Sequence, residues 1–211
     1  MLIDTCSTPD TASRERRADA RTSGQAKRDA DAYPAHVVGR RRVANGNTVE
    51  IRPIAPADGR LIRDFVRSLS FETRYLRFMS AVSELSTQTV EWLTRIDHRC
   101  DAALLAVVKE DGADRVVGVA RYALLVDGDD CEFAIVVADD WRDRGLGRLL
   151  MTLLIDTARA RGLKRIVGDV LAINEPMLSF VKELGFRVAP SGDDLTMRRV
   201  ERDVDGDRPP V

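Results

Sequence analysis

A loop at residues 137–148 combines residue types that bind phosphate groups. It leads from an apolar segment into a pattern of helical period and contains three arginines and two glycines, Arg142, Arg144, Gly145, Gly147 and Arg148. Free backbone N–H groups at the start of a helix, together with glycines that permit close approach, make a site for phosphate oxygens. The arginines add positive charge around that site. We therefore expect an anionic ligand at this loop.

Taken alone, the two glycines are equally consistent with a tight turn before a helix. Two other phosphate motifs do not match the spacing. A dinucleotide-binding fingerprint needs a third glycine where Leu150 stands, and a Walker loop needs Gly-Lys-Ser/Thr, which the sequence lacks. These two classes of nucleotide site are therefore excluded.

The helix after this loop is the most regular in the sequence. Leucines recur at the spacing of one helical face from Leu146 to Leu154, and Gly162 is placed to end the helix. A following strand at 163–171 should lie parallel to the strand before the loop, through a right-handed crossover. Shorter helices are expected to begin at Asp58, at Ser70 or Thr73, at Ser86 and at Asn174.

Alternation and turn chemistry predict three consecutive strands in the middle of the chain. Asp-Gly and Gly-Asp dipeptides separate them, which is typical of antiparallel hairpins. The strands expected in the whole chain cover 48–54, 102–109, 115–126, 131–138 and 163–171, with a final hairpin at 186–200. The fold class is therefore α/β of the mixed α+β kind, a mostly antiparallel central sheet flanked by helices.

The ends of the chain differ in composition from the middle. Residues 1–46 are rich in Arg, Asp, Ala, Ser and Thr, with almost no large aliphatic side chain before Val37. Such a segment cannot bury enough apolar surface to offset its ordering entropy, so we expect a disordered N-terminal extension. The alternative is a short arm that folds on a partner. One domain is expected over 47–200 and a flexible C-terminal tail over 201–211.

Composition excludes several functional classes. The 211 residues carry a formal net charge of -1, which removes a global attraction to nucleic acid or to anionic lipid. The longest apolar runs are far shorter than the ~20 residues that span a bilayer, so we expect a cytoplasmic protein without membrane contact. Three widely spaced cysteines and two distant histidines fit neither a disulfide framework nor a metal site. We expect free thiols and no bound metal.

Two ordered motifs resemble those of a known family. The pattern Arg142-x-x-Gly145-x-Gly147 after an apolar strand is similar to the acyl-CoA signature of the GCN5-related N-acetyltransferases, the GNAT family. A second block, residues 174–177 leading to Leu184-Gly-Phe186, follows at the distance typical of that family. Residues 68–78 and 131–137 further resemble the acetyltransferase domains of bacterial protein lysine acetyltransferases called Pat. The resemblance covers about 48–200.

The resemblance implies a GNAT fold, in which the two parallel strands of the sheet splay apart and leave backbone groups unpaired. It implies acetyl-CoA as the co-substrate, with pantetheine in the gap on Ile135, Val136 and Val137. An extended ligand that substitutes for a missing strand makes physical sense there. The pyrophosphate would then meet the loop and the helix start. The cofactor-binding residues implied are Ile135, Val136, Val137, Arg142, Asp143, Arg144, Gly145, Leu146, Gly147, Arg148 and Asn174.

Acyl transfer to an amine needs a group that takes a proton from the nucleophile, and Glu132 is the leading general base. A carboxylate within Cys-Glu-Phe-Ala-Ile-Val-Val is unusual for a plain core strand, and the Pat-like proteins have a glutamate with this role at the matching position. The alternative is a solvated strand glutamate near Asp129 and Asp130. Cys131 is expected to be a buried strand residue, because no histidine nearby would activate it as a nucleophile.

One departure from the wider family concerns the acid that protonates the leaving thiolate. Many members carry a tyrosine in the helix after the second block, where this sequence has Phe180 and Val181. Bulk water or the departing ammonium can supply the proton instead. Asn174 is expected both to cap that helix and to contact the cofactor.

The sequence points to an N-acetyltransferase that moves an acetyl group from acetyl-CoA to a primary amine. The Pat resemblance favours a protein lysine as the acceptor. A small amine, such as an amino acid, a polyamine or an aminoglycoside, is the first alternative. A CoA-binding regulatory module with little catalysis is the second, and the missing tyrosine is the observation that favours it.

Overall fold

The protein is described here by a computed structural model, which covers residues 33–44, 46–98, 100–125, 128–192 and 194–205. Within these ranges the strands are β1 (Gly39–Arg42), β2 (Thr48–Pro53), β3 (Ala102–Glu110), β4 (Ala113–Leu124), β5 (Asp130–Val137), β6 (Arg165–Leu171), β7 (Arg187–Ser191) and β8 (Asp194–Asp203). The α-helices are α3 (Gly59–Ser68), α4 (Phe71–Phe78), α5 (Thr87–Thr94), α6 (Leu146–Ala160) and α7 (Glu175–Glu183).

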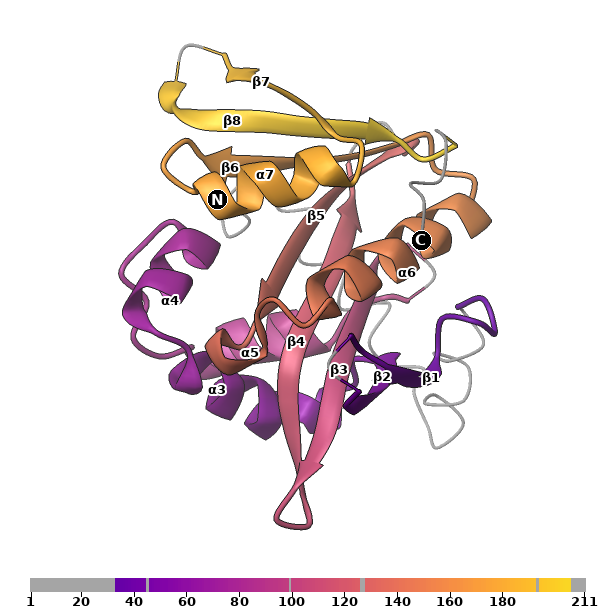
Figure 1. Cartoon of the computed structure of the whole chain (residues 1–211), viewed down its shortest axis with the longest axis vertical. Helices are drawn as coiled ribbons and strands as arrows, with labels where there is room; N and C mark the ends of the chain where they lie inside the picture. The colour runs from indigo at the N-terminus through magenta and orange to yellow at the C-terminus, as the bar shows by residue number, and fades with distance from the viewer. Residues whose placement is uncertain (1–32, 45, 99, 126–127, 193, 206–211) are drawn as a thin grey trace.

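In the described part of the chain, one eight-stranded sheet runs in the order β1-β2-β3-β4-β5-β6-β8-β7. The expected antiparallel meander of β3, β4 and β5 is confirmed, and so is the parallel pairing of β5 with β6 across α6. All other neighbouring strands are antiparallel. In Figure 1, α6 and α7 pass in front of the sheet and α5 lies behind it. This is the mixed sheet flanked by helices that the sequence predicts.

The parallel strands β5 and β6 remain paired over only three positions. Asp130, Cys131 and Glu132 lie opposite successive residues of β6, and the last pair joins Glu132 to Val167. Beyond that pair, β5 continues beside β4 to Val137 and β6 continues beside β8 to Leu171. The two strands therefore diverge at Glu132, and each keeps a free edge from there on.

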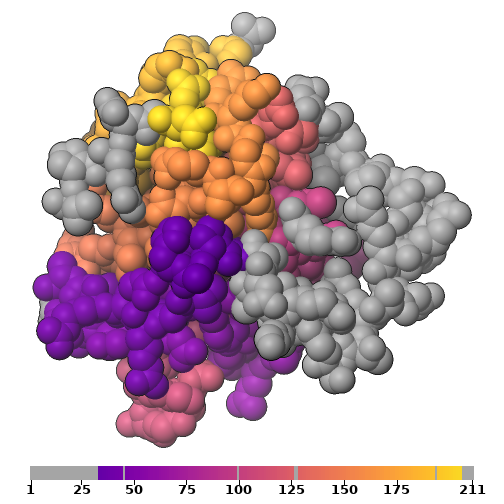
Figure 2. All heavy atoms as spheres, turned by 90° about the vertical axis from the view of Figure 1, so that its right-hand side faces the viewer, coloured from indigo at the N-terminus to yellow at the C-terminus, as the bar shows by residue number. Residues whose placement is uncertain are grey.

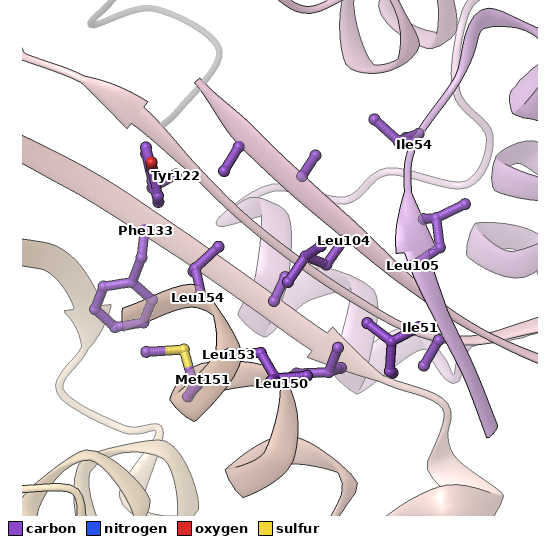
Figure 3. Packing of buried hydrophobic residues seen from close by; sticks show 14 of the residues in the cluster. Ile51, Ile54, Leu104, Leu105, Tyr122, Phe133, Leu150, Met151, Leu153 and Leu154 are labelled. Carbon is purple, nitrogen blue, oxygen red and sulfur yellow. The ribbon is translucent and has the colours of Figure 1, made fainter. Parts of the chain in front are cut away.

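The core lies where α6 packs on β3 and β4. Leu150, Met151 and Leu154 are fully buried on the sheet side of α6, and Figure 3 shows them close to side chains of the central strands. A Cβ atom on Gly118 of β4 would lie 2.8 Å from Cδ1 of Leu150. The absence of a side chain at Gly118 therefore lets α6 approach the sheet closely and fixes the position of its N-terminal end.

The N-terminal boundary differs from the expectation. Residues 33–44, which the sequence analysis assigned to a disordered extension, belong to the domain. Tyr33 and Val37 are buried, and β1 pairs with β2 along the sheet edge. The Tyr33 hydroxyl lies 2.9 Å from His98 Nδ1 and accepts a hydrogen bond from the backbone N–H of Ala103 at 2.9 Å. Figure 2 shows this indigo segment packed against the orange region that includes α6.

The physical reason for this error is that a short edge strand needs no apolar period. In β1 the arginine side chains alternate between exposed and half-buried positions, so its sequence resembles a charged linker. The domain also extends past residue 200, because β8 continues to Asp203 and Val204 is buried. The expected extension over residues 1–32 and the tail from residue 206 lie outside the described residues.

Helix starts follow the sequence with one exception. Ser70, Ser86 and Asn174 each accept a hydrogen bond from a backbone N–H in the first turn of their helix, as expected. Asp58 precedes α3 but does not cap it. Its carboxylate instead accepts from the backbone N–H of Ala55 at 2.7 Å and forms an ion pair with Arg52. The Asp58 carboxylate is therefore paired with the Arg52 guanidinium and does not cap the helix as expected.

Candidate active site

A cleft of about 520 Å³ lies where β5 and β6 diverge. Its walls come from α4, β5, the loop before α6, the first turn of α6, β6 and one face of α7. This volume is within the ordinary range for small-molecule sites. Most of the site residues expected from the sequence line this one cleft: Glu132, Ile135, Val136, Val137, Arg142, Asp143, Gly145, Gly147, Arg148 and Asn174.

Arg144 and Leu146 are the expected site residues whose side chains lie elsewhere. The Arg144 guanidinium stacks over the Trp141 ring at 5.2 Å and borders a separate hollow beside Asp140. The Leu146 side chain is buried against Gly118. Only the backbone groups of these two residues remain as possible ligand contacts.

The free edge of β5 presents alternate backbone groups to the cleft. Asp130 accepts a hydrogen bond from Leu125 on the β4 side, and Ala138 donates one to Val117 on the same side. The β4–β5 register has no bulge between these ends, so even-numbered residues bond to β4 and odd-numbered ones point away from it. The backbone N–H and C=O groups of Ile135 and Val137 therefore face the cleft. Val136 contributes its side chain.

The loop before α6 is fixed by α4. Asp139 accepts hydrogen bonds from the backbone N–H of Ser70 at 2.8 Å and from the Thr73 hydroxyl. Arg142 donates to the same hydroxyl at 2.5 Å and forms an ion pair with Asp139 at 3.1 Å. Burial acts to raise the pKa of Asp139, but the hydrogen bonds from Thr73 and Ser70 outweigh it and the pKa is lowered. The carboxylate therefore stays charged and holds Arg142 at the cleft.

The start of α6 offers unpaired donors. Gly145 is the N-cap residue, with φ at +76°, and it provides no side-chain cap to the first turn. The backbone N–H groups that follow are free, as at any helix start. Gly147 faces the cleft, and a Cβ atom there would lie 3.5 Å from the Phe180 ring, which is ordinary contact. Arg148 also faces the cleft, where its guanidinium contacts Glu183 at 2.8 Å.

The N-terminal segment also holds the loop before α6 in place. The backbone N–H of Ala44 donates to the carbonyl oxygen of Arg144 at 3.0 Å, and Ala44 Cβ is the nearest atom to a side chain built on Gly145. Ala44, which was expected to lie in a disordered extension, therefore supports the loop before α6.

Glu132 lies at the fork between β5 and β6, with its carboxylate in the cleft. Burial raises the pKa of Glu132 above its usual 4.5, and the charge of Asp169 raises it further. The charges of Arg199 and Arg77 lower it but do not cancel these effects. A carboxylate with a raised pKa in a cleft has the properties of a general base.

Asp169 and Arg77 also line the cleft, and the sequence analysis did not identify Asp169 as a site residue. The signal was present, because Asp169 is the acidic residue inside the apolar strand β6, as Glu132 is inside β5. Arg77 comes from α4, and burial together with the charge of Arg121 lowers its pKa to about 10. It therefore remains a cation at neutral pH.

Three further expectations can be compared with the structure. Burial raises the pKa of the Cys131 thiol to about 12, so it remains protonated and acts as a core residue. Asn174 Oδ1 accepts from the backbone N–H of Met177 at 3.2 Å, which confirms the cap. No tyrosine is among the described residues that line the cleft.

The described part of the chain also bears on metal binding and membrane contact. Within it, no cluster of three metal-ligating side chains occurs and no helix is long and apolar enough to cross a membrane.

Comparisons with known proteins agree with this geometry. The sequence profile described as the acetyltransferase (GNAT) family matches residues 66–186. The acetyltransferase PA5475 of Pseudomonas aeruginosa is 37% identical over 152 residues, which are 72% of this chain and 82% of that protein. The acetyltransferase Pat of Mycolicibacterium smegmatis is 30% identical over 173 residues, 81% of this chain. The match spans 49% of the Pat protein.

Two further similarities concern the fold and the acceptor. The crystal structure of the GNAT domain of S. lividans PAT superposes with a TM-score of 0.73 at 26% identity, covering 81% of this chain and 99% of that domain. A P. aeruginosa protein named L-methionine sulfoximine/L-methionine sulfone acetyltransferase is 31% identical over 102 residues, 44% of this chain and 56% of that protein.

Proposed function

The chain belongs to the acetyltransferase (GNAT) family and is an acyl-CoA-dependent N-acetyltransferase, and we propose that it transfers acetyl groups to protein lysines with Glu132 as the general base. The observation that supports this proposal most is the position of Glu132 at the fork of β5 and β6. There the last β5–β6 pair ends, the free edge of β5 begins, and Glu132 lines the same cleft as that edge.

Acetyl-CoA fits the cleft through this chain's own groups. The backbone N–H and C=O groups of Ile135 and Val137 can hydrogen-bond an extended pantetheine as a neighbouring strand would. The free N–H groups at the start of α6, with Arg142 and Arg148 beside them, suit the pyrophosphate. The Glu183 carboxylate contacts the Arg148 guanidinium at 2.8 Å and would compete with the pyrophosphate for it.

The reaction requires two proton movements. Glu132 takes one proton from the acceptor's ammonium, directly or through a water molecule. The neutral amine then attacks the thioester carbonyl carbon, a C–N bond forms, and the C–S bond breaks to release the CoA thiolate. The second amine proton passes to the thiolate through solvent, since no tyrosine lines the described cleft. Glu132 loses its own proton to solvent before the next turnover.

Exposed apolar side chains at the cleft favour a macromolecular acceptor. Phe71 is 65% exposed and directly precedes Glu72, which lines the cleft, while Ile173 is 70% exposed and directly precedes Asn174. Exposed apolar side chains indicate protein binding where they form a contiguous patch, and Phe71 stacks on the partly exposed Tyr75 with ring centroids 6.4 Å apart. The similarity to Pat proteins points the same way.

The test is a turnover assay with thiol detection, joined to mass spectrometry of a lysate incubated with the protein and labelled acetyl-CoA. We expect free CoA to accumulate and label to appear on protein lysines, and Glu132→Gln to lower the rate of both by about 10²- to 10⁴-fold. Label found on small amines alone would contradict the lysine acceptor. Tight binding of acetyl-CoA with no CoA release by any amine would instead identify a binding module.

A small amino-acid acceptor is the second candidate, and Arg77 is the observation that favours it. This cation lines the cleft beside Glu132, and within the described chain it forms no ion pair with a carboxylate. The α-carboxylate of a free amino acid could occupy that position. Methionine sulfone as acceptor, compared with its methyl ester, tests this candidate, because the ester lacks the carboxylate that Arg77 would bind.

A further inference from the structure

Two carboxylates lie on one face of the sheet at the fork. Glu132 pairs with Val167, and paired residues of neighbouring strands share a face. Asp169 is two residues further along β6, so it shares that face as well. At a rise of about 3.3 Å per residue, it lies about 7 Å beyond the level of Glu132. Both side chains line the cleft.

The opposite face at this level is filled by an aromatic ring. A Cβ atom on Gly168 would lie 2.8 Å from Cε1 of Phe133, and the Phe133 ring packs against Phe186 at 5.3 Å between centroids. The glycine thus admits the ring, and the ring closes that side of the fork. The polar groups at the fork are therefore confined to the face that carries Glu132 and Asp169.

Asp169 is held by two donors that come from the last two strands. Arg199, which is paired with Asp169 from β8, donates to Oδ2 of Asp169 at 3.0 Å. The Ser191 hydroxyl at the end of β7 donates to Oδ1 of Asp169 at 3.3 Å. A carboxylate has about four lone-pair positions, so each oxygen keeps acceptor capacity towards the cleft. The two bonds fix the orientation of the carboxylate without using up that capacity.

We infer that Asp169 is an acceptor-binding residue, oriented by Arg199 and Ser191, that receives the ammonium group of the acceptor and positions its nitrogen next to Glu132. This inference rests on the proposed amine acetylation. An ammonium group has three N–H donors, so it can bond to both carboxylates at once. Asp169 retains its hydrogen bond while Glu132 takes the proton, and the neutral amine is left in place for attack on the thioester.

The same arrangement couples Asp169 to the basicity of Glu132. Among the described residues, the charged groups that act on Glu132 are Asp169 on β6, Arg199 on β8 and Arg77 on α4, while its neighbour on β4, Ala123, is uncharged. Asp169 raises the pKa of Glu132 and Arg199 lowers it. Substitutions at these two positions must therefore move the acidic limb of the pH–rate profile in opposite directions.

The experiment uses the full chain, acetyl-CoA and Nα-acetyl-lysine amide as the acceptor, with Asp169→Asn as the principal variant. We expect the KM for the amine to rise at least about 10-fold, the size of a lost charged hydrogen bond, with the KM for acetyl-CoA unchanged. The acidic limb of kcat/KM should move to lower pH in Asp169→Asn and to higher pH in Arg199→Gln. A merely structural role would lower the melting temperature and leave the limb in place.

Two controls separate charge from orientation. Ser191→Ala keeps every charge, so it should raise the KM for the amine only modestly and leave the limb unmoved. Asp203→Asn removes an exposed carboxylate of the same hairpin, which pairs with Arg187 at 3.8 Å, and should change neither parameter. Parent-like KM and pH profile in a folded Asp169→Asn variant would overturn the inference.

The outcomes also distinguish this inference from the proposed function. If the parent protein releases no thiol with the lysine amide, the labelled lysate decides whether protein lysines are acetylated, and Asp169 is judged separately. In that case ¹³C-carboxyl NMR titration of Glu132 decides, because it needs no acceptor. A lower Glu132 pKa in Asp169→Asn and a higher one in Arg199→Gln would support the two-carboxylate site, and an unchanged pKa in both would reject it.

Discussion

Glu132 on β5 lies opposite Val167 on β6, and this pair is the last before the two strands diverge. The relationship explains how one carboxylate can be half-buried within a strand and still reach a ligand. On the paired side of the fork the backbone is satisfied by neighbouring strands, and on the open side it is free to bind an extended substrate. The proposed base therefore stands at the boundary between the rigid sheet and the binding cleft.

The raised pKa of Glu132 predicts a pH-dependent stability. The folded protein holds this proton more tightly than the unfolded chain, so the contribution is fully present below the usual value of 4.5 and is lost as the pH rises through the raised value. Glu132→Gln removes this loss. Melting curves from about pH 4 to about pH 8 should show the variant at least as stable as the parent at the upper end. If Glu132→Gln were less stable than the parent only at pH values above the raised pKa of Glu132, the assignment would be contradicted.

Gly147→Asp should weaken acetyl-CoA binding severely without unfolding the protein. The carboxylate would stand among the N–H groups that we expect to bind the pyrophosphate, so like charges would repel, whereas an aspartate in the first turn of a helix is otherwise favourable. Gly147→Ala is the matched control, because its Cβ would be in ordinary contact with the Phe180 ring at 3.5 Å and with Cγ2 of Val137 at 3.9 Å. Calorimetry with acetyl-CoA and a melting curve without ligand measure the two halves. Equal affinity of Asp and Ala variants would argue against a phosphate site here.

Glu183→Gln should strengthen acetyl-CoA binding. The Glu183 carboxylate contacts Arg148 at 2.8 Å in the cleft and competes with the pyrophosphate for its charge. Both side chains are partly exposed, so we expect a gain of about two- to five-fold at low salt, the size of a surface ion pair. Arg148→Gln should weaken binding, and Arg187→Gln, which removes an exposed arginine that does not line the cleft, should not change it. Weaker binding by Glu183→Gln would show that the pair supports the site instead.

Tyr33→Phe should destabilise the domain, although Tyr33 lies outside residues 47–200, to which the sequence assigned the domain. The change removes the hydroxyl that contacts His98 and accepts from the N–H of Ala103, at a cost of about 1–3 kcal/mol. For a domain of this size, each 1 kcal/mol lowers the melting temperature by about 2–4 °C. Tyr75→Phe is the control, since Tyr75 is 38% exposed. Equal melting temperatures for the two variants would mean that residues 33–44 contribute little.

Much of the fold could be predicted because its elements carry strong local signals. The leucine spacing of α6 predicts an amphipathic helix. The Asp-Gly turns between β3, β4 and β5 predict antiparallel hairpins. The edge strand β1 could not be predicted in this way. Its exposed arginines follow no apolar alternation, and Tyr33 and Val37 are buried only because distant segments cover them.

The candidate site shows the same division. The helix start at Gly145 and Gly147 was predictable, because the leucine pattern that follows fixes where α6 begins, and both glycines line the cleft as expected. The position of Asp169 was not, since its relation to Glu132 exists only after β6 has paired with β5 through a crossover. The side chain of Arg144 was expected at the phosphate and instead stacks on Trp141, because a nearby aromatic ring offers the guanidinium a contact that spacing alone does not reveal.

The most direct test of the account is the pH dependence of turnover in the parent protein and in Glu132→Gln, measured as thiol release at saturating acetyl-CoA. We predict that the variant binds acetyl-CoA as the parent does but turns over about 10²- to 10⁴-fold more slowly at neutral pH, the range for a lost general base. The acidic limb of the parent, which should lie above the usual glutamate value of 4.5, should be absent from the variant. Turnover within a few-fold of the parent, with the limb retained, would contradict Glu132 as the base.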